Sequence, residues 1–501
     1  MLFTKSARSL KSQLAAMSLA VVFSESLAAA LTPELIPSQN VGPAPLAVFF
    51  DATRTSTDDT SVDSYRQLGY RFKFNDPASG FWSANGTSKS EQIGGPLALH
   101  VFEKPGSYEV SLEVKGHDGG SATLTKTITV QDPDVVFAAN RTTCLAVFPT
   151  QHTCPSGGAE LIISIWPALQ NGNRYLLASG QDFTALGPLN MKCSYCQLGA
   201  YSEGENPILA QLRVNDAGSS LGTNFVVEGL SPAVINMSMG GKNGLIFRNK
   251  FKANATISAS SAINLGTGVD YLFMKTADQT ISWPRNIAIV ENQMSLNKLR
   301  DYGFFGSATE LALVGNTISS SMQHAIRIPM AYKALVAHNY LEKPGSIKSH
   351  IKLHSRGLDP WNGEFLYQTL NGATRYVVLS GNRIGGVDGD VNSYEMPAAP
   401  QNDTKAEGLE DIINEDNIFI KNPLASNSQR EIVFSGRRLT SRGNRFENRE
   451  GEVSVGTGAH GAALPQDWQG PYFINEISIR SLLSPELPTL SPPAAVSLSV
   501  Q

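Results

Sequence analysis

The repeated hexapeptides LVGNTI (313–318) and VAHNYL (336–341) decide the fold. Each is a short apolar run that ends in an asparagine followed by a bulky residue. The pattern recurs at Asn249, Asn292, Asn316, Asn339, Asn382, Asn417 and Asn444. The intervals of 43, 24, 23, 43, 35 and 27 residues are mostly one or two multiples of a short repeat, with room for inserted loops. Such a unit cannot bury its apolar face alone, so the repeats are expected to stack as coils around a shared core.

This repeat resembles the right-handed parallel β-helix of the pectate-lyase-like superfamily, over residues 135–480. The stretches NRYLLASGQDF (173–183) and LGAYSEGENPI (198–208) are similar to the first coils of such helices. The resemblance implies that each recurring asparagine lies at a turn, bonds to the asparagine of the next coil and tolerates a left-handed backbone. The asparagines are therefore expected to be structural. A leucine-rich-repeat solenoid is disfavoured, because the chain lacks an L-x-x-L-x-L repeat.

An all-β module is expected before the solenoid, over residues 42–132. Alternating segments such as PLAVFFDA (45–52) are separated by Pro, Gly, Asn and Asp, as the short strands of a sandwich are. The stretch HVFEKPGSYEVSLEV (100–114) resembles the PKD domain, an immunoglobulin-like sandwich. That resemblance implies a spacer or a module that contacts carbohydrate or protein, and it implies no catalysis. The expected fold class is all-β, with a β-sandwich at 31–133 and a right-handed parallel β-helix at 134–481.

The two ends of the chain are expected to lie outside these domains. Residues 1–30 combine a basic start, a short apolar core and small residues at Ala28 and Ala30, as a signal peptide does. A membrane anchor is disfavoured, because the apolar core is shorter than the roughly 20 residues that a span needs. No membrane span is expected in the mature chain, and the protein is predicted to be secreted, periplasmic or on the cell surface. The Pro-rich end, 482–501, is expected to be disordered and removable by protease.

The four cysteines are expected to form disulfides in an oxidising compartment. Cys144 and Cys154 are ten positions apart, and Cys193 and Cys196 form the motif CSYC. Two local bridges, 144 to 154 and 193 to 196, are the simplest of the three possible pairings. A zinc site made of all four thiolates is the alternative, although the unequal loops do not match those of a zinc ribbon.

The segment SHIKLHSRG (349–357) is an unusually basic extended stretch. By strand alternation, Ile351 and Leu353 point to one side, and the basic side chains point to the other. These basic residues are His350, Lys352, His354 and Arg356. Aligning this segment with AIRIP (325–329) at an offset of 25 places Arg327 beside Lys352, outside the coil. Cations about 4.8 Å apart repel one another unless something anionic lies between them.

A ligand groove is therefore predicted around this pair. Tyr302 from the preceding coil and Glu395 from the following coil are expected near the same column. The insertion at 357–373 adds Trp361, Phe365 and Tyr367, aromatic rings that either stack on sugar faces or pack on the flank of the helix. An extended acidic polysaccharide fits such a surface. A solvated basic face, neutralised by nearby carboxylates, is the alternative.

The predicted reaction is β-elimination on a uronate-containing polysaccharide. A lyase must neutralise the C6 carboxylate, remove the C5 proton and protonate the leaving C4 oxygen. Arg327 suits the first role, because its guanidinium is permanently charged and forks onto a carboxylate. Lys352 is the expected base, since like-charged neighbours favour a neutral amine. His354, His350 or Tyr302 could act as base or acid, and the superfamily resemblance implies only an Arg paired with a Lys on neighbouring coils.

Two other functions stay open. A β-helix can serve as a non-catalytic polysaccharide-binding or adhesion protein. A glycoside hydrolase would need carboxylates as acid and base. A polygalacturonase is disfavoured, because there is no Asn-Thr-Asp, the motif near the C-terminus reads AHG (459–461), and the Asp58–Asp59 pair lies in the sandwich module.

Composition limits the other partners. The chain has 501 residues, a net charge of -4 and no Lys/Arg-rich run, which argues against nucleic acid or an anionic membrane as a general partner. A monomer without a cofactor is expected. Asp388, Asp390 and Asn392 have the spacing of a calcium loop, but the twelfth position is Ala399 rather than Glu. An ordinary turn is favoured there, and calcium stays open.

Overall fold

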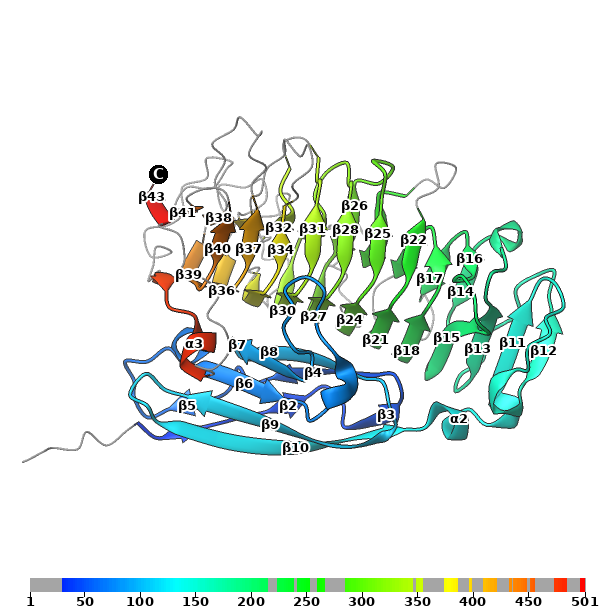
Figure 1. Ribbon diagram of the computed structural model, residues 1–501, viewed down its shortest axis with the longest axis horizontal. Helices are drawn as coiled ribbons and strands as arrows, with labels where there is room; N and C mark the ends of the chain where they lie inside the picture. Colours follow the sequence, from blue (N-terminus) through cyan, green and yellow to red (C-terminus); the bar gives the residue numbers. More distant parts are fainter. Residues whose placement is uncertain are drawn as a thin grey trace, which may run out of the picture.

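The computed structural model describes residues 29–214, 223–237, 241–252, 259–265, 284–345, 348–354, 374–385, 396–398, 409–420, 432–434, 436–447, 451–455, 473–483 and 496–500. A β-sandwich formed by the first part of the chain lies along one side of a long stack of parallel strands (Figure 1). The stack is a parallel β-helix, because each coil adds one strand to each of several parallel sheets. The expected fold, an N-terminal sandwich followed by a β-helix, is confirmed.

The sandwich pairs a larger and a smaller sheet around an aromatic core. Its strands are β3 (Val41–Pro43), β10 (Ser121–Gln131), β9 (Gly106–Lys115), β6 (Gly69–Lys73) and β7 (Glu91–Gly94) in one sheet, β2 (Ile36–Pro37), β4 (Leu46–Asp51) and β8 (Leu97–Phe102) in the other, and the pair β1 (Leu31–Thr32) and β5 (Ser56–Thr57). Short helical turns lie at α1 (Ser64–Gln67) and η1 (Pro77–Ser79). Alternate side chains of β6 and β9 point inward, among them Tyr70, Phe72 and Leu112.

Three parallel sheets, named A, B and C here, form the β-helix in the described residues. Sheet A contains β12 (Ala159–Ile162), β11 (Thr142–Ala146), β13 (Arg174–Ala178), β15 (Cys196–Tyr201), β18 (Thr223–Glu228), β21 (Lys242–Phe247), β24 (Arg285–Val290), β27 (Ala308–Val314), β30 (Ala331–Ala337), β33 (Arg375–Ser380), β36 (Leu409–Glu415), β39 (Gly436–Arg442) and β42 (Phe473–Glu476). Sheet B contains β14 (Leu189–Met191), β17 (Leu212–Val214), β20 (Ile235–Met237), β23 (Ser261–Leu265), β26 (Tyr302–Gly306), β29 (Ile326–Ile328), β32 (Ile351–Leu353), β35 (Met396–Ala398), β38 (Ile432–Phe434), β41 (Gly451–Val455) and β43 (Val496–Val500). Sheet C contains β22 (Lys250–Lys252), β25 (Gln293–Ser295), β28 (Thr317–Ser319), β31 (Tyr340–Glu342), β34 (Arg383–Ile384), β37 (Ile418–Ile420) and β40 (Arg445–Glu447).

A few short elements join or flank these sheets. They are the parallel pair β16 (Ile208–Leu209) and β19 (Ser231–Pro232), the helices α2 (Pro133–Val136) and α3 (Ile479–Leu483), and the 3-10 turns η2 (Ala139–Arg141), η3 (Pro155–Gly157) and η4 (Thr184–Leu186). No described helix is long and apolar enough to cross a membrane.

The seven asparagines form a buried ladder at the corner between sheets A and C, which confirms their structural role. From Asn292 onward, the side-chain oxygen of each asparagine accepts two hydrogen bonds, from the backbone N–H and the side-chain amide of the asparagine one coil before, at 2.9 to 3.0 Å. The Asn249 oxygen, at the start of the ladder, accepts from the Leu230 N–H at 3.0 Å. The left-handed backbone was expected at the asparagine itself. It lies instead at the preceding residue, for example Glu291, Gly315 and His338. Each asparagine side chain can therefore point along the stack and reach the asparagine of the next coil.

Asn339→Ala tests the ladder at its centre. The Asn339 amide donates to the Leu313 carbonyl at 2.8 Å and to Asn382 at 2.9 Å, and its Oδ1 accepts both bonds from Asn316. Alanine would leave several buried polar groups unpaired, so the free energy of unfolding should fall by about 3 kcal/mol or more. Denaturant unfolding of the variant measures this. The exposed Asn190 on β14 is the matched control, and Asn190→Ala should change stability by less than about 0.5 kcal/mol. Equal effects of the two substitutions would contradict the role given to the ladder.

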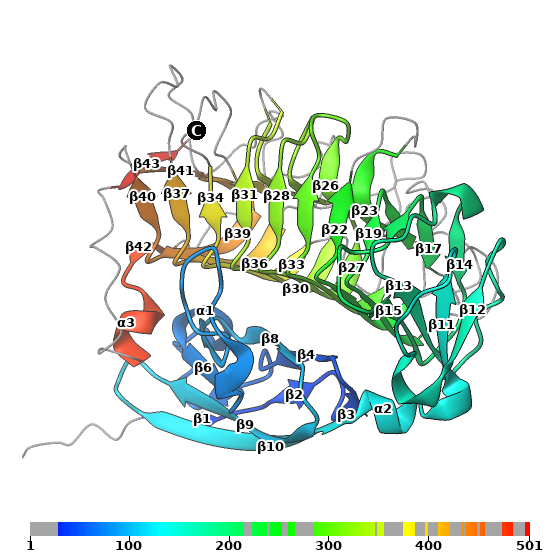
Figure 2. The same ribbon diagram turned by 45° about the vertical axis from the view of Figure 1, so that its right-hand side comes forward.

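The sandwich packs against the outer face of sheet A rather than standing apart from the solenoid (Figure 2). Ala47, Phe49, Trp82, Leu97 and Leu99 of the sandwich share one buried cluster with apolar side chains from successive sheet A strands. Those side chains are Leu245, Phe247, Ala288, Val290, Ala312, Val314, Leu335, Ala337, Val378 and Ile413. The PKD resemblance implied a spacer or a module that contacts carbohydrate or protein, and here the sandwich contacts the solenoid of its own chain. The two folds share a core.

Polar contacts fix the orientation of the two folds. The Arg248 guanidinium donates two hydrogen bonds to the Glu103 carboxylate, at 2.6 and 2.7 Å. The Lys333 Nζ lies 2.5 Å from the Asp51 Oδ2. The Gly95 N–H donates to the buried Glu415 at 2.7 Å. The Lys333–Asp51 and Gly95–Glu415 contacts are partly or fully buried, so water competes less for them than for the exposed Arg248–Glu103 pair. They select one docked arrangement of the sandwich.

One hairpin of the sandwich reaches the turns of the asparagine ladder. The Trp82 ring stacks on the His338 ring at 5.2 Å, and the Asn85 amide lies 2.9 Å from His338 Nδ1 and 2.8 Å from the Gly381 carbonyl. Burial, and to a smaller extent Arg480, lowers the pKa of His338 to about 3, so its imidazole is neutral and Nδ1 accepts from Asn85. Gly315 has a left-handed backbone, and a Cβ there would lie 2.5 Å from the Trp82 ring. Glycine therefore permits this close approach.

Both predicted disulfides are confirmed: Cys144 bonds to Cys154 and Cys193 bonds to Cys196. The zinc alternative is therefore wrong. At the other end of the chain, the expectation of a disordered tail differs from what the structure describes. Residues 496–500 form β43, which pairs with β41. Ile479 and Leu483 of α3 are buried against Ile93 of the sandwich.

Candidate functional site on the outer face of sheet B

Arg327 and Lys352 lie next to each other on neighbouring coils. Strands β29 and β32 pair in parallel with Arg327 opposite Lys352, flanked by the pairs Ile326–Ile351 and Ile328–Leu353. All four apolar side chains belong to the central core of the β-helix and are at most 1% exposed. The register expected from the sequence, with an offset of 25, is therefore observed.

Aromatic rings hold the Arg327 guanidinium. Its Nη1 donates to the Tyr302 hydroxyl at 2.6 Å, and the guanidinium carbon lies 5.5 Å from the Tyr302 ring centre and 5.6 Å from that of Phe305. Phe305 is the residue opposite Arg327 on β26. Ring faces attract cations without neutralising them. No ion pair of Arg327 with a carboxylate is found among the described residues.

His324 is a further member of this cluster that the sequence analysis missed. Its Nδ1 lies 3.0 Å from both the backbone N–H and the carbonyl of Ser349, and its ring stacks on Tyr302 at 6.2 Å. Burial, together with the positive charges of Lys352, Arg327 and Lys348, lowers the pKa of His324 to about 3, and the Ser349 contact opposes this shift. The imidazole is neutral at neutral pH. The same offset of 25 that pairs Arg327 with Lys352 also aligns His324 with Ser349, which is the signal that could have found it.

The basic strand is more buried than expected. Lys352 is 7% exposed, His354 3% and His350 0%, so these side chains do not form an open, solvated stripe. Coils stacked about 4.8 Å above and below a strand cover much of its side-chain surface. Tyr302 is 6% exposed, whereas Arg327 keeps intermediate exposure. The structure thus brings Tyr302, Arg327 and Lys352 together in a partly buried cluster.

Several predicted site residues lie outside the described residues. They are Arg356, Trp361, Phe365, Tyr367 and Glu395, and the possible calcium ligands Asp388, Asp390 and Asn392. Strand β35 pairs Ala398 with Leu353, so the position next to Lys352 on that strand is Pro397. The column expected to contain Glu395 therefore continues through Pro397.

A line of polar and aromatic side chains leads to the Arg327–Lys352 pair. On successive strands of sheet B, strand pairing sets one central residue opposite the next. From β14 to β32 these residues are Asn190, Arg213, Asn236, Asn264, Phe305, Arg327 and Lys352. The Asn264 amide donates to Asn236 at 2.7 Å. Between β14 and β32, the column contains three cations and no carboxylate.

A separate cleft of about 490 Å³ lies where the sandwich hairpin meets the corner of sheets A and C. It is lined by Phe81, Trp82, Glu228, Arg248 and Glu291, among others. Burial raises the pKa of Glu228 to about 7, opposed by the Arg248 charge. Glu291 is held in ion pairs by Lys89 and by Arg248, the latter at 2.7 Å. A carboxyl group that titrates near neutrality suits a general acid. If the protein is a hydrolase, this cleft is therefore the candidate site.

Comparison with known proteins identifies one of the two folds. Residues 34–130 match the family model of the PKD domain. The N-terminal sandwich is thus a PKD domain. No curated protein sequence matches the chain.

Two solved structures are similar to the chain over most of its length. One is the family 28 exopolygalacturonase of Yersinia enterocolitica, with a TM-score of 0.40 and 10% identity over 94% of this chain and 99% of that one. The other is the catalytic domain of a GH87 α-1,3-glucanase in complex with nigerose, with a TM-score of 0.22 and 10% identity over 95% and 96% of the two chains. At these scores, neither carries an argument about the activity of this chain.

Proposed function

We propose that this protein binds an acidic polysaccharide along the outer face of sheet B and cleaves it by β-elimination. The observation that carries the proposal is the adjacent pair of cations, Arg327 and Lys352, at the end of a polar column that has no carboxylate among its described residues. Two neighbouring positive charges favour an anionic ligand between them. The pKa of the neighbouring His324 is lowered mainly by burial and, to a smaller extent, by the charges of Lys352 and Arg327.

Each residue has a role that its surroundings support. Arg327 neutralises the uronate carboxylate, and Tyr302 together with the Phe305 ring holds the guanidinium in place. Lys352, the adjacent basic group, removes the C5 proton when its amine is in the neutral form, and the amine becomes an ammonium in that step. The proton for the C4 oxygen comes from the Tyr302 hydroxyl, which lies within reach of the same guanidinium. The C4–O bond breaks as the C4–C5 double bond forms, so no water is consumed.

Export of the chain is part of the same proposal. The two disulfides fit an oxidising compartment, where extracellular polysaccharides are met. Of the segment interpreted as a signal peptide, residues 1–30, all but the last two lie outside the described residues.

A polymer screen tests this function. The mature protein is incubated with alginate, pectate, glycosaminoglycans and ulvan, and the products are followed by the ultraviolet absorbance of a 4,5-unsaturated uronate and by reducing ends. The proposal predicts that one polymer gives both signals together. New reducing ends without the chromophore would indicate a hydrolase, and loss of that activity in Glu228→Gln would place it in the cleft of Glu228. Salt-sensitive binding without cleavage would indicate a binding protein.

A further inference from the structure

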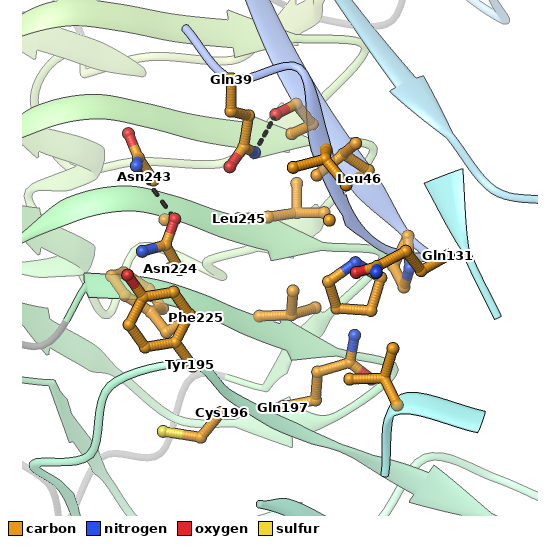
Figure 3. Close-up of a pocket in the computed structure, with 18 of the residues that line it drawn as sticks. Gln39, Leu46, Gln131, Tyr195, Cys196, Gln197, Asn224, Phe225, Asn243 and Leu245 are labelled. Atoms are coloured by element: carbon orange, nitrogen blue, oxygen red, sulfur yellow. Dashed lines mark hydrogen bonds between the residues drawn. The ribbon is translucent and has the colours of Figure 1, made fainter. Parts of the chain in front are cut away.

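A cavity of about 320 Å³ lies between the PKD sandwich and the first coils of sheet A (Figure 3). Its volume falls within the range of about 300 to 1,000 Å³ that is usual for small-ligand pockets, which often form at domain interfaces. Val226, Leu245 and Ala288 of sheet A face it from one side. Pro43, Pro45 and Leu46 of the sandwich line it too. None of its lining residues belongs to sheet B, which carries Arg327 and Lys352.

Uncharged amides supply much of the polar lining. These residues are Gln39, Gln131, Gln197, Asn224, Asn243 and Asn286. Some of their groups are already used: Asn286 donates to Asn243 at 2.8 Å. Asn243 donates to Asn224 at 3.0 Å, and Gln39 donates to the Ala47 carbonyl at 2.7 Å (Figure 3). The Asn224 amide nitrogen, the Gln39 oxygen and the whole Gln131 amide make no hydrogen bond among the described residues. The cavity thus presents both donors and acceptors.

An aromatic side chain lies at the edge of the cavity. Tyr195 is 63% exposed, and it sits between the two cysteines of the Cys193–Cys196 disulfide. Its backbone is left-handed, and its N–H donates to the Thr223 carbonyl at 2.8 Å. The disulfide and this bond fix the small loop that carries the ring. Exposed aromatic rings fixed in this way offer a flat apolar surface for a ligand.

We propose that the cavity binds a neutral sugar, as one residue of a neutral oligosaccharide. A pyranose ring has an apolar face that suits Tyr195 and the apolar walls, and its hydroxyls both donate and accept, as the amides do. Among the described lining residues none is an acid and Arg141 is the sole cation, so the lining favours an uncharged ligand. A purely apolar ligand fits less well, because it would remove water from the amides without replacing their hydrogen bonds.

Titration calorimetry on the full mature protein tests the site. The probes are maltohexaose, cellohexaose, mannohexaose and xylohexaose, with the uncharged dye N-phenyl-1-naphthylamine as an apolar probe. At least one neutral hexamer should bind with a stoichiometry of one. Tyr195→Ala should weaken that binding by about tenfold, and Tyr195→Phe should keep most of it, because the ring is what contacts the sugar. Gln131→Ala should weaken it severalfold.

Matched variants separate this site from others. Phe148 is also an exposed aromatic residue, at 66%, and does not line the cavity, so Phe148→Ala should leave binding unchanged. Lys352→Ala should also leave it unchanged, which distinguishes this site from the one on sheet B. The proposal is overturned if no neutral hexamer binds at up to about 10 mM. It is equally overturned if Tyr195→Ala and Gln131→Ala have no effect, or if the apolar probe alone occupies the cavity.

Discussion

Lys352→Ala is expected to abolish the formation of unsaturated products from the acidic polymer, with a loss of at least about 1,000-fold in rate. A positioned general base accelerates a proton transfer by about 10²- to 10⁴-fold. The variant would also lose one of the two positive charges that bind the polymer. The measurement is the initial rate of ultraviolet absorbance under saturating polymer. Lys348→Ala is the matched control: Lys348 is a neighbouring cation that acts on His324 but lies outside the column of sheet B, so it should cost less than about tenfold.

Arg327→Lys provides a second arm of the same test. The ammonium keeps the charge but cannot make the two parallel hydrogen bonds of a guanidinium, and it loses the bond to the Tyr302 hydroxyl in its present geometry. The rate should fall by about 100-fold while the thermal unfolding temperature stays close to that of the native protein. Retention of the native rate in both Lys352→Ala and Arg327→Lys would rule out this site as the catalytic one.

Removing the sandwich is expected to make the β-helix insoluble. Deletion of residues 29–131 would expose the apolar outer face of sheet A, including Phe247, Leu335 and Ile413, which are at most 1% exposed in the whole protein. Contiguous apolar patches of this kind drive association. The soluble yield and the size-exclusion profile of the truncated chain measure the effect.

The deletion would also give an insoluble product if the sandwich were needed only while the chain folds. Cutting the linker of the folded protein distinguishes these two explanations. A protease site inserted after Asp134, in the exposed turn α2, should allow cleavage without dissociation, because the two pieces share a buried core. The pieces should coelute until denaturant is added. Separation of the pieces in native buffer would contradict the shared core and restore the picture of a spacer.

The repeat made the solenoid predictable from the sequence. A coil register can be read from residues that recur at one position, as Asn316 and Asn339 do 23 residues apart, and a similar spacing of 25 residues aligned Arg327 with Lys352. Stacking then leaves little freedom for neighbouring side chains. For this reason the buried ladder, the inward-facing isoleucines and the cation pair were all predicted correctly.

The docking of the sandwich was not predicted, although a signal was present. Segments such as IAIV (287–290) and LALV (311–314) are continuously apolar, which is typical of strands covered on both faces. We expected only one face of these strands to be buried, in the core of the solenoid. Their other face is buried too, because Ala288, Val290 and Val314 contact the sandwich. The burial of Lys352 was missed for a similar reason, since strand alternation gives the direction of a side chain and not what covers it.

The corner between sheets A and C has the same length in every coil from β21 to β40, whereas the connections on either side of sheet B vary. Two residues join β27 to β28 and β30 to β31. By contrast, one residue lies between β26 and β27, and 21 lie between β32 and β33. Segments next to Lys352 could therefore be exchanged or extended without shifting the coils. This makes the chain a suitable scaffold for grafting binding loops, with the asparagine corner left untouched.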